Sequence, residues 1–420
     1  MHGYYSVSQA AHKLGVCTET IRRWDNDGTL KATRNPTNNY RFYDEDSINK
    51  ISFLRAVKAG NTEAHTHIHP KRKITSIELF AGAGGLALGM EWAGIDHLLL
   101  NEIDKYACQT LRTNRPEWNV VEGDISHIDF KPYKGKVDIV TGGFPCQTFS
   151  YAGKKMGFED VRGTMFYEFA RCIKETEPHI FIGENVRGLL NHDNGNTLKT
   201  MVRILEDLGY DVIKPQVLRA IHYKVPQKRE RLIIVGVKKD SGLTFEYPKP
   251  QPNIYTLKDA LKAGRLYTTD VPKSAGQEYP KRKKEILSLV PPGGYWRDLP
   301  VTLQKEYMMK SYYLGGGKTG MARRIAWDEP SLTLTCAPAQ KQTERCHPDE
   351  TRPFQVREYA RIQTFPDEWK FAGSVGQQYK QIGNAVPVNF GYFLGQAVVQ
   401  CLNAHCDIEQ QKPAIYAAAQ

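Results

Sequence analysis

The segment at residues 137–147 constrains the fold most, because a short apolar run ends there in a tight loop. Residues 137–140 are rich in β-branched side chains, which is typical of a buried strand. Two glycines, Gly142 and Gly143, permit a sharp turn, and Pro145 fixes the backbone beside Cys146. In open α/β sheets, the loops at the carboxyl ends of the strands line the ligand-binding crevice. The segment therefore predicts an α/β sheet with Cys146 at its binding edge. An inert buried thiol is the alternative.

Positive charge is concentrated in two parts of this 420-residue chain, whose length favours two or three domains. Residues 1–75 hold 12 Lys and Arg against 7 Asp and Glu, and residues 236–350 hold 19 against 13. The remaining residues are balanced, with 26 of each sign. Localised basicity is the electrostatic signature of a polyanionic partner, so both parts are candidates for binding nucleic acid.

Composition favours a reducing, cytoplasmic setting. The sequence has no long apolar run for a membrane span and no charged-then-apolar export signal at its start. Eight cysteines lack paired short spacings, which argues against a zinc knuckle or a disulfide framework. They are Cys17, Cys108, Cys146, Cys172, Cys336, Cys346, Cys401 and Cys406. His65, His67 and His69 alternate near the basic residues 71–73, but no fourth ligand is close in sequence, so no metal is expected.

Residues 4–60 predict a compact helical unit. Ser6 is a suitable N-cap for a first helix, because apolar residues follow it at helical spacing: Val7, Ala10, Ala11 and Leu14. After a turn at residues 15–16, Thr18 is the expected cap of a second helix that carries Arg22 and Arg23. A helix, a glycine turn and a basic helix form the helix-turn-helix pattern, whose second helix enters the major groove of DNA.

Residues 31–43 predict a wing that contains Arg34 and Arg41, and residues 48–57 predict a third helix. This unit resembles the winged helix-turn-helix of MerR-type regulators in residues 5–11 (YSVSQAA), 20–24 (TIRRW) and 39–43 (NYRFY). The resemblance implies that Arg22, Arg23, Arg34 and Arg41 bind DNA. A small protein-interaction domain is the alternative.

Three further strands are predicted, and each is followed by residues suited to a nucleotide. Residues 74–80 alternate as a strand, and the glycine-rich residues 81–87 open a helix whose N–H groups point at a ligand. Glu102 ends the next strand, and Asp124 follows the third. Acids at successive strand ends suit an adenosine-bearing cofactor. Gly82 and Gly84 also fit a dinucleotide fingerprint, so an NAD-dependent oxidoreductase is a rival prediction.

Three later segments discriminate between these predictions. Residues 180–186 form a strand with Glu184 and Asn185 at its tip, residues 227–231 precede another strand, and residues 381–387 open a last apolar helix through residue 397. Hydride transfer to a nicotinamide does not require Cys146, Glu184 and Arg231 together.

Residues 74–402 resemble the DNA cytosine-5 methyltransferases, with the main blocks of that family in order. The blocks are residues 80–85 (FAGAGG), 101–104 (NEID), 123–125 (GDI), 143–147 (GFPCQ), 184–186 (ENV), 227–231 (QKRER) and 381–387 (QIGNAVP). The resemblance implies a Rossmann-like, S-adenosylmethionine-dependent catalytic domain at residues 74–237 and 354–410. A small, irregular target-recognition domain at residues 238–353, a linker at 61–73 and the winged helix-turn-helix at 1–60 complete the expected architecture.

The family mechanism implies a role for each catalytic residue. Cys146 would add to C6 of a cytosine extruded from the duplex, because a thiolate is the best side chain for that addition. Glu184 would hydrogen-bond N3, Arg231 would hold O2 with support from Arg229, and Asn185 would fix the loop. The resemblance also implies a cofactor site, without metal, formed by Phe80, Gly82, Gly84, Gly85, Glu102, Ile103, Asp124, Ile125, Pro145, Asn384 and Val386. Ile103 departs from the tryptophan that better-studied members often carry there.

DNA contacts are expected in two further regions. Residues 150–163 are basic and glycine-bearing, and they predict a mobile lid with Lys154, Lys155 and Arg162. In the expected recognition domain, residues 333–336 and 340–345 are the candidates for base contacts. The residues expected to bind DNA there are Arg323, Arg324, Gln340 and Arg345.

Together the two resemblances imply a site-specific DNA methyltransferase of a restriction-modification system. Its substrate is double-stranded DNA, which we expect it to bind as a monomer. The N-terminal unit would bind a second, operator site, as a dimer, and regulate transcription. The alternative is a catalytically inactive, DNA-binding transcriptional regulator.

Overall fold

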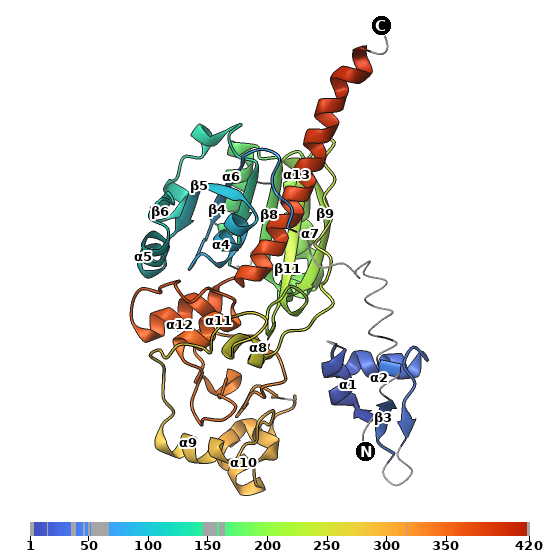
Figure 1. The fold of residues 1–420 in the computed structure, drawn as a ribbon, viewed down its shortest axis with the longest axis vertical. Coiled ribbons are helices and arrows are strands. Elements are labelled where there is room, and N and C mark those ends of the chain that lie inside the picture. Colours follow the sequence, from blue (N-terminus) through green and yellow to red (C-terminus); the bar gives the residue numbers. More distant parts are fainter. Residues whose placement is uncertain are drawn as a thin grey trace. The chain divides into compact units, whose positions relative to one another are not determined.

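The computed structural model describes residues 4–14, 16–34, 39–44, 47–48, 51, 67–145, 158, 164–316 and 318–417. The chain divides into two compact units. The first comprises Met1–Thr66 with Lys249–Ile254, and the second comprises His67–Pro248 with Tyr255–Gln420. Figure 1 shows the elements of both units along the chain.

The described part of the N-terminal unit contains the two helices of the predicted helix-turn-helix and a small sheet. Helices α1 (Val7–Lys13) and α2 (Thr18–Asn26) accompany an antiparallel sheet with the order β1 (Tyr4–Ser6), β3 (Arg41–Asp44) and β2 (Thr33–Arg34). Ser6 Oγ accepts a hydrogen bond from the Gln9 amide at 3.3 Å, and Gln9 Oε1 accepts one from the Ser6 amide at 2.9 Å. This reciprocal pair caps α1.

Two further predictions for this unit concern the start of α2 and the third helix. The prediction that Thr18 caps α2 is wrong by one residue, because Cys17 holds the extended N-cap conformation and Thr18 is the first helical residue. Most of the third predicted helix, 48–57, lies outside the described residues. The small core consists of Ala10, Ala11, Leu14, Ile21, Leu30, Tyr43 and Ile48.

A seven-stranded sheet forms the centre of the second unit, in the order β6-β5-β4-β7-β8-β11-β9. The strands are β4 (Ile74–Leu79), β5 (Ile95–Glu102), β6 (Val120–Glu122), β7 (Ile139–Gly142), β8 (Ile180–Val186), β9 (Tyr210–Arg219) and β11 (Glu230–Lys238). From β6 to β8 neighbouring strands are parallel, whereas β11 is antiparallel to both β8 and β9. All predicted strands are present, with shifts of a few residues at their ends.

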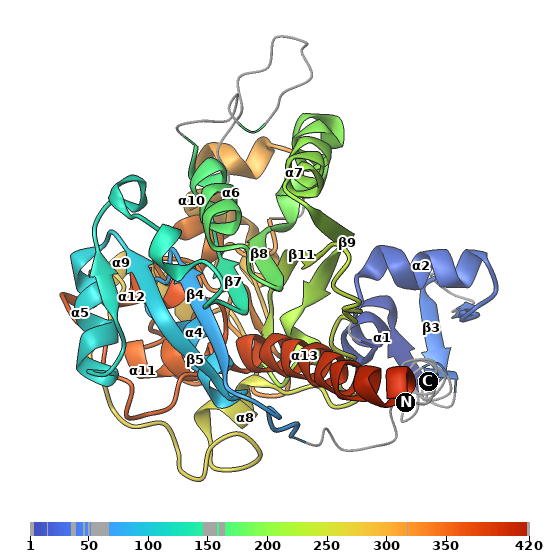
Figure 2. The same cartoon turned by 90° about the horizontal axis from the view of Figure 1, so that it is seen from above.

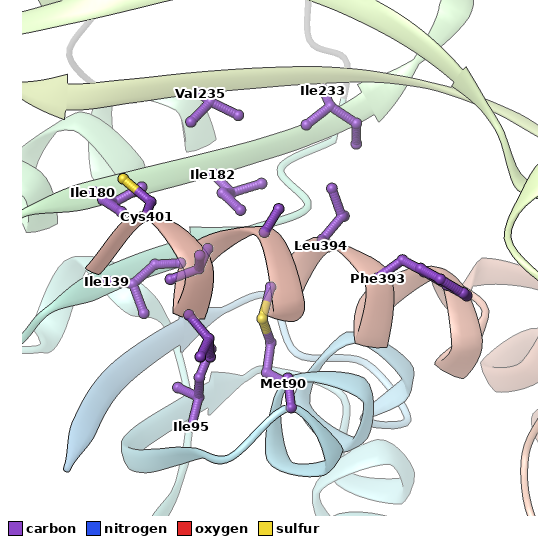
Figure 3. Packing of buried hydrophobic residues seen from close by; sticks show 14 of the residues in the cluster. Met90, Ile95, Ile139, Ile180, Ile182, Ile233, Val235, Phe393, Leu394 and Cys401 are labelled. Atoms are coloured by element: carbon purple, nitrogen blue, oxygen red, sulfur yellow. The ribbon is translucent and has the colours of Figure 1, made fainter. Parts of the chain in front are cut away.

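Helices cover both faces of this sheet, and Figure 2 shows α13 (Val388–Ala417) on the face opposite α6 (Met165–Thr176) and α7 (Asn196–Asp207). Helix α4 (Gly85–Trp92) packs beside α13. Successive strand residues point to opposite faces, so Ile180 and Ile182 join α13 in one core cluster while Phe181 joins α6 in the other. Figure 3 shows Ile180, Ile182, Ile233 and Val235 of the sheet together with Leu394 and Cys401 of α13.

One segment of the described chain, Val375–Cys406, is long and apolar enough to cross a membrane by length and composition alone. Of its most apolar window, 83% is buried inside the protein. We therefore interpret it as a core segment, since it supplies much of the cluster that covers the sheet.

The predicted last helix is divided. Residues 381–384 are the end of α12 (Val375–Asn384), and α13 begins at Val388. The prediction that residues 381–387 open the last helix is therefore wrong. Pro387 explains the break, because it lacks a backbone N–H and its ring clashes with the preceding helical turn.

The end of the predicted linker packs against α13. The amide of Ile68 donates to Gln396 Oε1 at 2.6 Å, and the amide of Lys71 donates to Asn403 Oδ1 at 2.8 Å. His67 Nδ1 lies 3.0 Å from the Tyr392 hydroxyl. Residues 67–73 therefore belong to the second unit, while His65 lies outside the described residues. No group of three His, Cys, Asp or Glu side chains suited to a metal ion occurs among the residues described.

The region expected to recognise DNA is largely irregular, with α8 (Leu257–Leu261), α9 (Lys281–Ser288) and α10 (Val301–Met308). It has its own core, which includes Trp296, Tyr307 and Met308. A parallel pair, β10 (Gln227–Lys228) with β12 (Ser331–Leu332), joins it to the catalytic part, and α11 (Val356–Ile362) returns the chain. The remaining elements are α5 (Lys105–Asn114) and the 3-10 turns Ile125–His127, Lys131–Tyr133, Arg187–Gly195, Ala220–His222, Trp296–Asp298, Met309–Tyr313 and Lys341–Thr343.

Candidate active site

A cavity of about 680 Å³ lies at the carboxyl ends of the parallel strands. Its walls come from the segments that follow β4, β5, β6, β7 and β8 and from the break between α12 and α13. Nine of the eleven residues expected to bind a cofactor line it: Phe80, Gly82, Glu102, Ile103, Asp124, Ile125, Pro145, Asn384 and Val386.

The carboxylate of Glu102 is held by backbone amides. Its Oε2 accepts from Gly82 at 2.7 Å, and its Oε1 accepts from Ile103 at 2.9 Å and from Asp104 at 2.8 Å. Gly82 has a φ of 55°, a conformation that glycine adopts without strain. The glycine turn and the acid at the end of β5 therefore form one rigid wall of the cavity.

Gly84 and Gly85 do not line the cavity, and the structure gives them a packing role. A Cβ on Gly85 would lie 2.0 Å from the carbonyl oxygen of Val386, and a Cβ on Gly84 would lie 2.6 Å from Leu111. Only a residue without a side chain lets α4 and the loop before α13 approach this closely.

The rim of the cavity carries an exposed apolar side chain and two acids. Ile103 is 70% exposed. Asp124 caps a short turn through the Ser126 amide at 2.9 Å, and this hydrogen bond lowers the pKa of its carboxyl. Asp104 pairs with Lys380 of α12 at 2.8 Å.

Glu184 and Arg231 form an ion pair at the other end of the cavity. Glu184 Oε1 lies 2.5 Å from Arg231 Nε, and the side chains are 13% and 15% exposed. They come from the neighbouring strands β8 and β11. A Cβ on Gly143 would lie 3.2 Å from Glu184 Oε2, so the carboxylate also touches the loop that leads to Pro145.

Asn185 holds the same loop in place by hydrogen bonds. Its Nδ2 donates to the Phe144 carbonyl at 2.9 Å, its Oδ1 accepts from the Val186 amide at 2.8 Å, and the residue is buried. The next residue after Pro145 is Cys146, which lies outside the described residues together with Lys154, Lys155 and Arg162.

Arg229 has a different place from the one expected. It is buried, it does not line the cavity, and its Nη1 and Nη2 donate to the carbonyls of Gly383 at 3.1 Å and Asn384 at 3.3 Å. Burial, followed by the neighbouring charge of Arg231, lowers the pKa of its guanidinium to about 9. Arg229 therefore caps the carboxyl end of α12, whose dipole favours a cation there.

The arginines expected to contact DNA in the recognition region are internal. Arg324 is buried and donates to the carbonyls of Val290, His347, Pro348 and Leu287. Arg345 is buried as well, and Arg323 is paired with Glu329. In the structure Arg324 and Arg345 are buried and Arg323 is partly buried, and all three stabilise the fold. Their contact with DNA stays a prediction. Gln340 is exposed.

The arginines of the N-terminal unit differ in availability. Arg22, Arg23 and Arg34 are exposed. Asp25 Oδ2 pairs with two of these arginines, at 2.6 Å from Arg41 Nε and at 3.5 Å from Arg34 Nη2. Arg22 and Arg23 lie on α2, the second helix of the helix-turn-helix pattern.

Among the cavity residues that were not expected from the sequence, Glu78 has the most unusual environment. Glu78 of β4 lines the cavity but is only 2% exposed, and burial raises the pKa of its carboxyl to about 8. Thr141 Oγ1 donates to it at 3.4 Å. An acid between Ile77 and Leu79 inside an apolar strand was the available signal.

A comparison of protein families identifies this arrangement. The family model for C-5 cytosine-specific DNA methylases matches residues 74–400. The chain belongs to this family. It is therefore a DNA (cytosine-5-)-methyltransferase, which excludes the NAD-dependent alternative. The model for MerR helix-turn-helix regulatory proteins matches residues 5–62.

Several relatives of this methyltransferase are similar over most of their length. Type II methyltransferase M.Eco47II of Escherichia coli is 63% identical, covering 95% of this chain and 96% of its own. Type II methyltransferase M.Sau96I of Staphylococcus aureus is 52% identical, covering 80% and 78%. Among solved structures, a Spodoptera frugiperda DNMT2 variant covers 78% of this chain and 99% of its own with a TM-score of 0.53, and at 16% identity it shows the shared fold.

Proposed function

We propose that the enzyme methylates C5 of cytosine within one short duplex sequence, through a transient bond between Cys146 and C6 of the base. The observation that carries this proposal is the Glu184–Arg231 pair, which lies in the cavity against the loop leading to Pro145 and Cys146. A base placed there would meet a thiol, a carboxyl group and a guanidinium together.

The cavity fits S-adenosylmethionine. Its volume lies within the range of about 300–1,000 Å³ that is typical of small-molecule sites. Glu102 keeps lone pairs for ribose hydroxyls, Ile103 offers an apolar surface for a ring, and Asp124 is exposed at the next strand end. When bound, the cofactor supplies an electrophilic methyl group.

The residues of the chain would activate the cytosine. Addition of the Cys146 thiolate to C6 pushes electrons toward C5 and places negative charge toward N3 and O2. Glu184, when protonated, donates to N3, and Arg231 donates to O2. After C5 takes the methyl group, it loses its proton to a base in the site, the sulfur–C6 bond breaks, and the thiolate is restored.

Because this chemistry cannot reach a stacked base, the cytosine must leave the duplex, at a cost of a few kcal/mol. Asn185 supports that step indirectly, since it fixes the Phe144 carbonyl and with it the start of the reactive loop. The lid residues Lys154, Lys155 and Arg162 are proposed to hold the displaced strand.

We place the main phosphate contacts of the recognition region on α9 and α10, because the arginines first expected to bind DNA are internal. Residues 281–318 contain eight Lys and Arg against three Asp and Glu. Lys281, Lys284, Lys305 and Lys310 are exposed, and beside them Tyr313 is 77% exposed. Lysines suit phosphates, and an exposed aromatic ring suits a base or sugar.

The N-terminal unit is proposed to bind a separate operator and to regulate transcription. The MerR match and the exposed Arg22 and Arg23 on α2 support this role. We propose a restriction-modification setting in the cytoplasm, and the Type II methyltransferases among its relatives support the first part of this proposal. We expect a monomer on the methylation site and a dimer on the operator.

Sequencing at base resolution tests the activity. DNA from cells that express the full chain should carry 5-methylcytosine at one position of one short sequence, and a Cys146→Ser variant should leave that DNA unmodified. Bound but unmethylated DNA with the native chain would instead support the inactive-regulator alternative.

A further inference from the structure

Residues 333–336 of the recognition region contact two residues that line the cavity, Gly383 and Asn384. This segment lies directly against the end of α12, since a Cβ on Gly383 would lie 2.4 Å from the Thr335 carbonyl oxygen. Residue 383 and its neighbour Asn384 both line the cavity. Residues 333–336 therefore connect the recognition region to the lining of the cavity.

One side chain of this segment reaches the cavity lining. Cys336 Sγ donates a hydrogen bond to Asn384 Oδ1 at 3.0 Å. Cys336 is exposed, as Cys17 is, and partial desolvation by the neighbouring chain raises the pKa of its thiol above the ordinary value. An ordinary thiol is already protonated near neutral pH, so the group can act as a donor. A carboxamide whose oxygen is held in this way presents its Nδ2 as the donor for a ligand.

The segment is itself anchored by residues of the recognition region and of β10. The Leu334 amide donates to Gln227 Oε1 at 3.0 Å, and Arg345 Nε donates to the Thr333 carbonyl at 3.2 Å. Thr335 Oγ1 lies 3.1 Å from Thr343 Oγ1. A shift of residues 340–345, which carry the exposed Gln340 at their start, would therefore move Cys336.

We propose that Cys336 is a positioning residue that orients the carboxamide of Asn384 toward the cofactor and so couples the recognition region to the cofactor cavity. The inference rests on the proposed placement of S-adenosylmethionine in that cavity. It assigns no bond-making role to this thiol.

The first test compares three variants of the full chain in their affinity for S-adenosylhomocysteine without DNA. Cys336→Ala removes the donor and should weaken binding about three- to tenfold, as expected for one hydrogen bond. Cys336→Ser keeps a donor and should bind within about twofold of the native chain. Cys17→Ala changes an exposed cysteine of the other unit and should have no effect. In methylation assays, the Ala variant should raise KM for S-adenosylmethionine more than it lowers kcat.

A second measurement needs no variant. Alkylation of each cysteine by N-ethylmaleimide, followed by peptide mass spectrometry, should slow at Cys336 when S-adenosylhomocysteine is added and stay constant at Cys17. Equal affinity of Cys336→Ala and the native chain, or equal loss in Cys336→Ser and Cys336→Ala, would overturn the inference. Failure of the native chain to bind S-adenosylhomocysteine would instead overturn the proposed cofactor site.

Discussion

Glu184 and Arg231 lie on neighbouring antiparallel strands and form an ion pair in the wall of the cavity, where we propose that a base binds. We predict that Glu184→Gln lowers kcat for methyl transfer by about 10²–10⁴-fold, because the amide cannot supply a proton to N3. Binding of S-adenosylhomocysteine should change little. Tritiated methyl transfer to plasmid DNA measures the effect, and activity within tenfold of the native chain would contradict the assigned role.

Glu78 provides a pH-dependent prediction. Burial raises the pKa of its carboxyl from the ordinary value near 4.5 to about 8, so the folded chain binds a proton that the unfolded chain releases. Its contribution to stability is complete below about pH 4.5 and is lost as pH rises toward 8, with a slope of at most about 1.4 kcal/mol per pH unit. Glu78→Gln should therefore gain in relative stability as pH rises from 5 to 8. Urea unfolding of both proteins would show parallel pH profiles if the assignment is wrong.

The positions of some individual residues could be predicted from the sequence, and those of others could not. The types and order of Glu102, Glu184 and Asn185 predicted the cavity lining, because each follows or ends an apolar strand. The burial of Arg324 and Arg345 was not predictable, since the carbonyls that they bind come from loops without periodicity.

Among the elements, the end of α12, just before the break at Pro387, is capped by the guanidinium of Arg229. Arg229 satisfies two carbonyls at the end of α12 from a fully buried position. We predict that Arg229→Met lowers the free energy of unfolding by about 1–3 kcal/mol, because those carbonyls lose their donors.

Arg187→Ala is the matched control, because that arginine is 64% exposed and pairs with Glu230 on the surface. It should change stability by no more than about 0.5 kcal/mol. Urea denaturation measures the free energy of unfolding of both variants. An equal decrease in the two would show that the buried Arg229 cap stabilises the fold no more than a surface ion pair does.

Most strands of the large sheet could be predicted from the sequence. The strand pair that joins the catalytic part to the recognition region could not. Apolar runs ended by polar residues predicted six of the seven strands of the large sheet, whereas β9 was not predicted. The last helix was misread because its apolar pattern continues through Pro387, and only the proline indicated the break. The two-residue pair of β10 with β12 is too short to leave a pattern.

At the scale of the molecule, two compact units carry two proposed functions. We predict that the double variant Arg22→Ala, Arg23→Ala loses binding to the promoter of its own gene while plasmid methylation continues. Lys131→Ala, an exposed change in the second unit, is the control for loss of a cation. Promoter footprinting and methylation assays on the same preparations separate the activities. Loss of both together would make the N-terminal unit a part of the catalytic machinery.

The covalent step can be observed directly with duplex DNA that carries 5-fluorocytosine at the methylated position. Fluorine cannot leave C5 as the proton does, so the account predicts that the native chain and S-adenosylmethionine form a denaturant-stable complex with this DNA. Peptide mass spectrometry should locate the attachment at Cys146, and a Cys17→Ala chain should form the same complex. Attachment at another residue, or methylation activity without any trapped complex, would contradict the account.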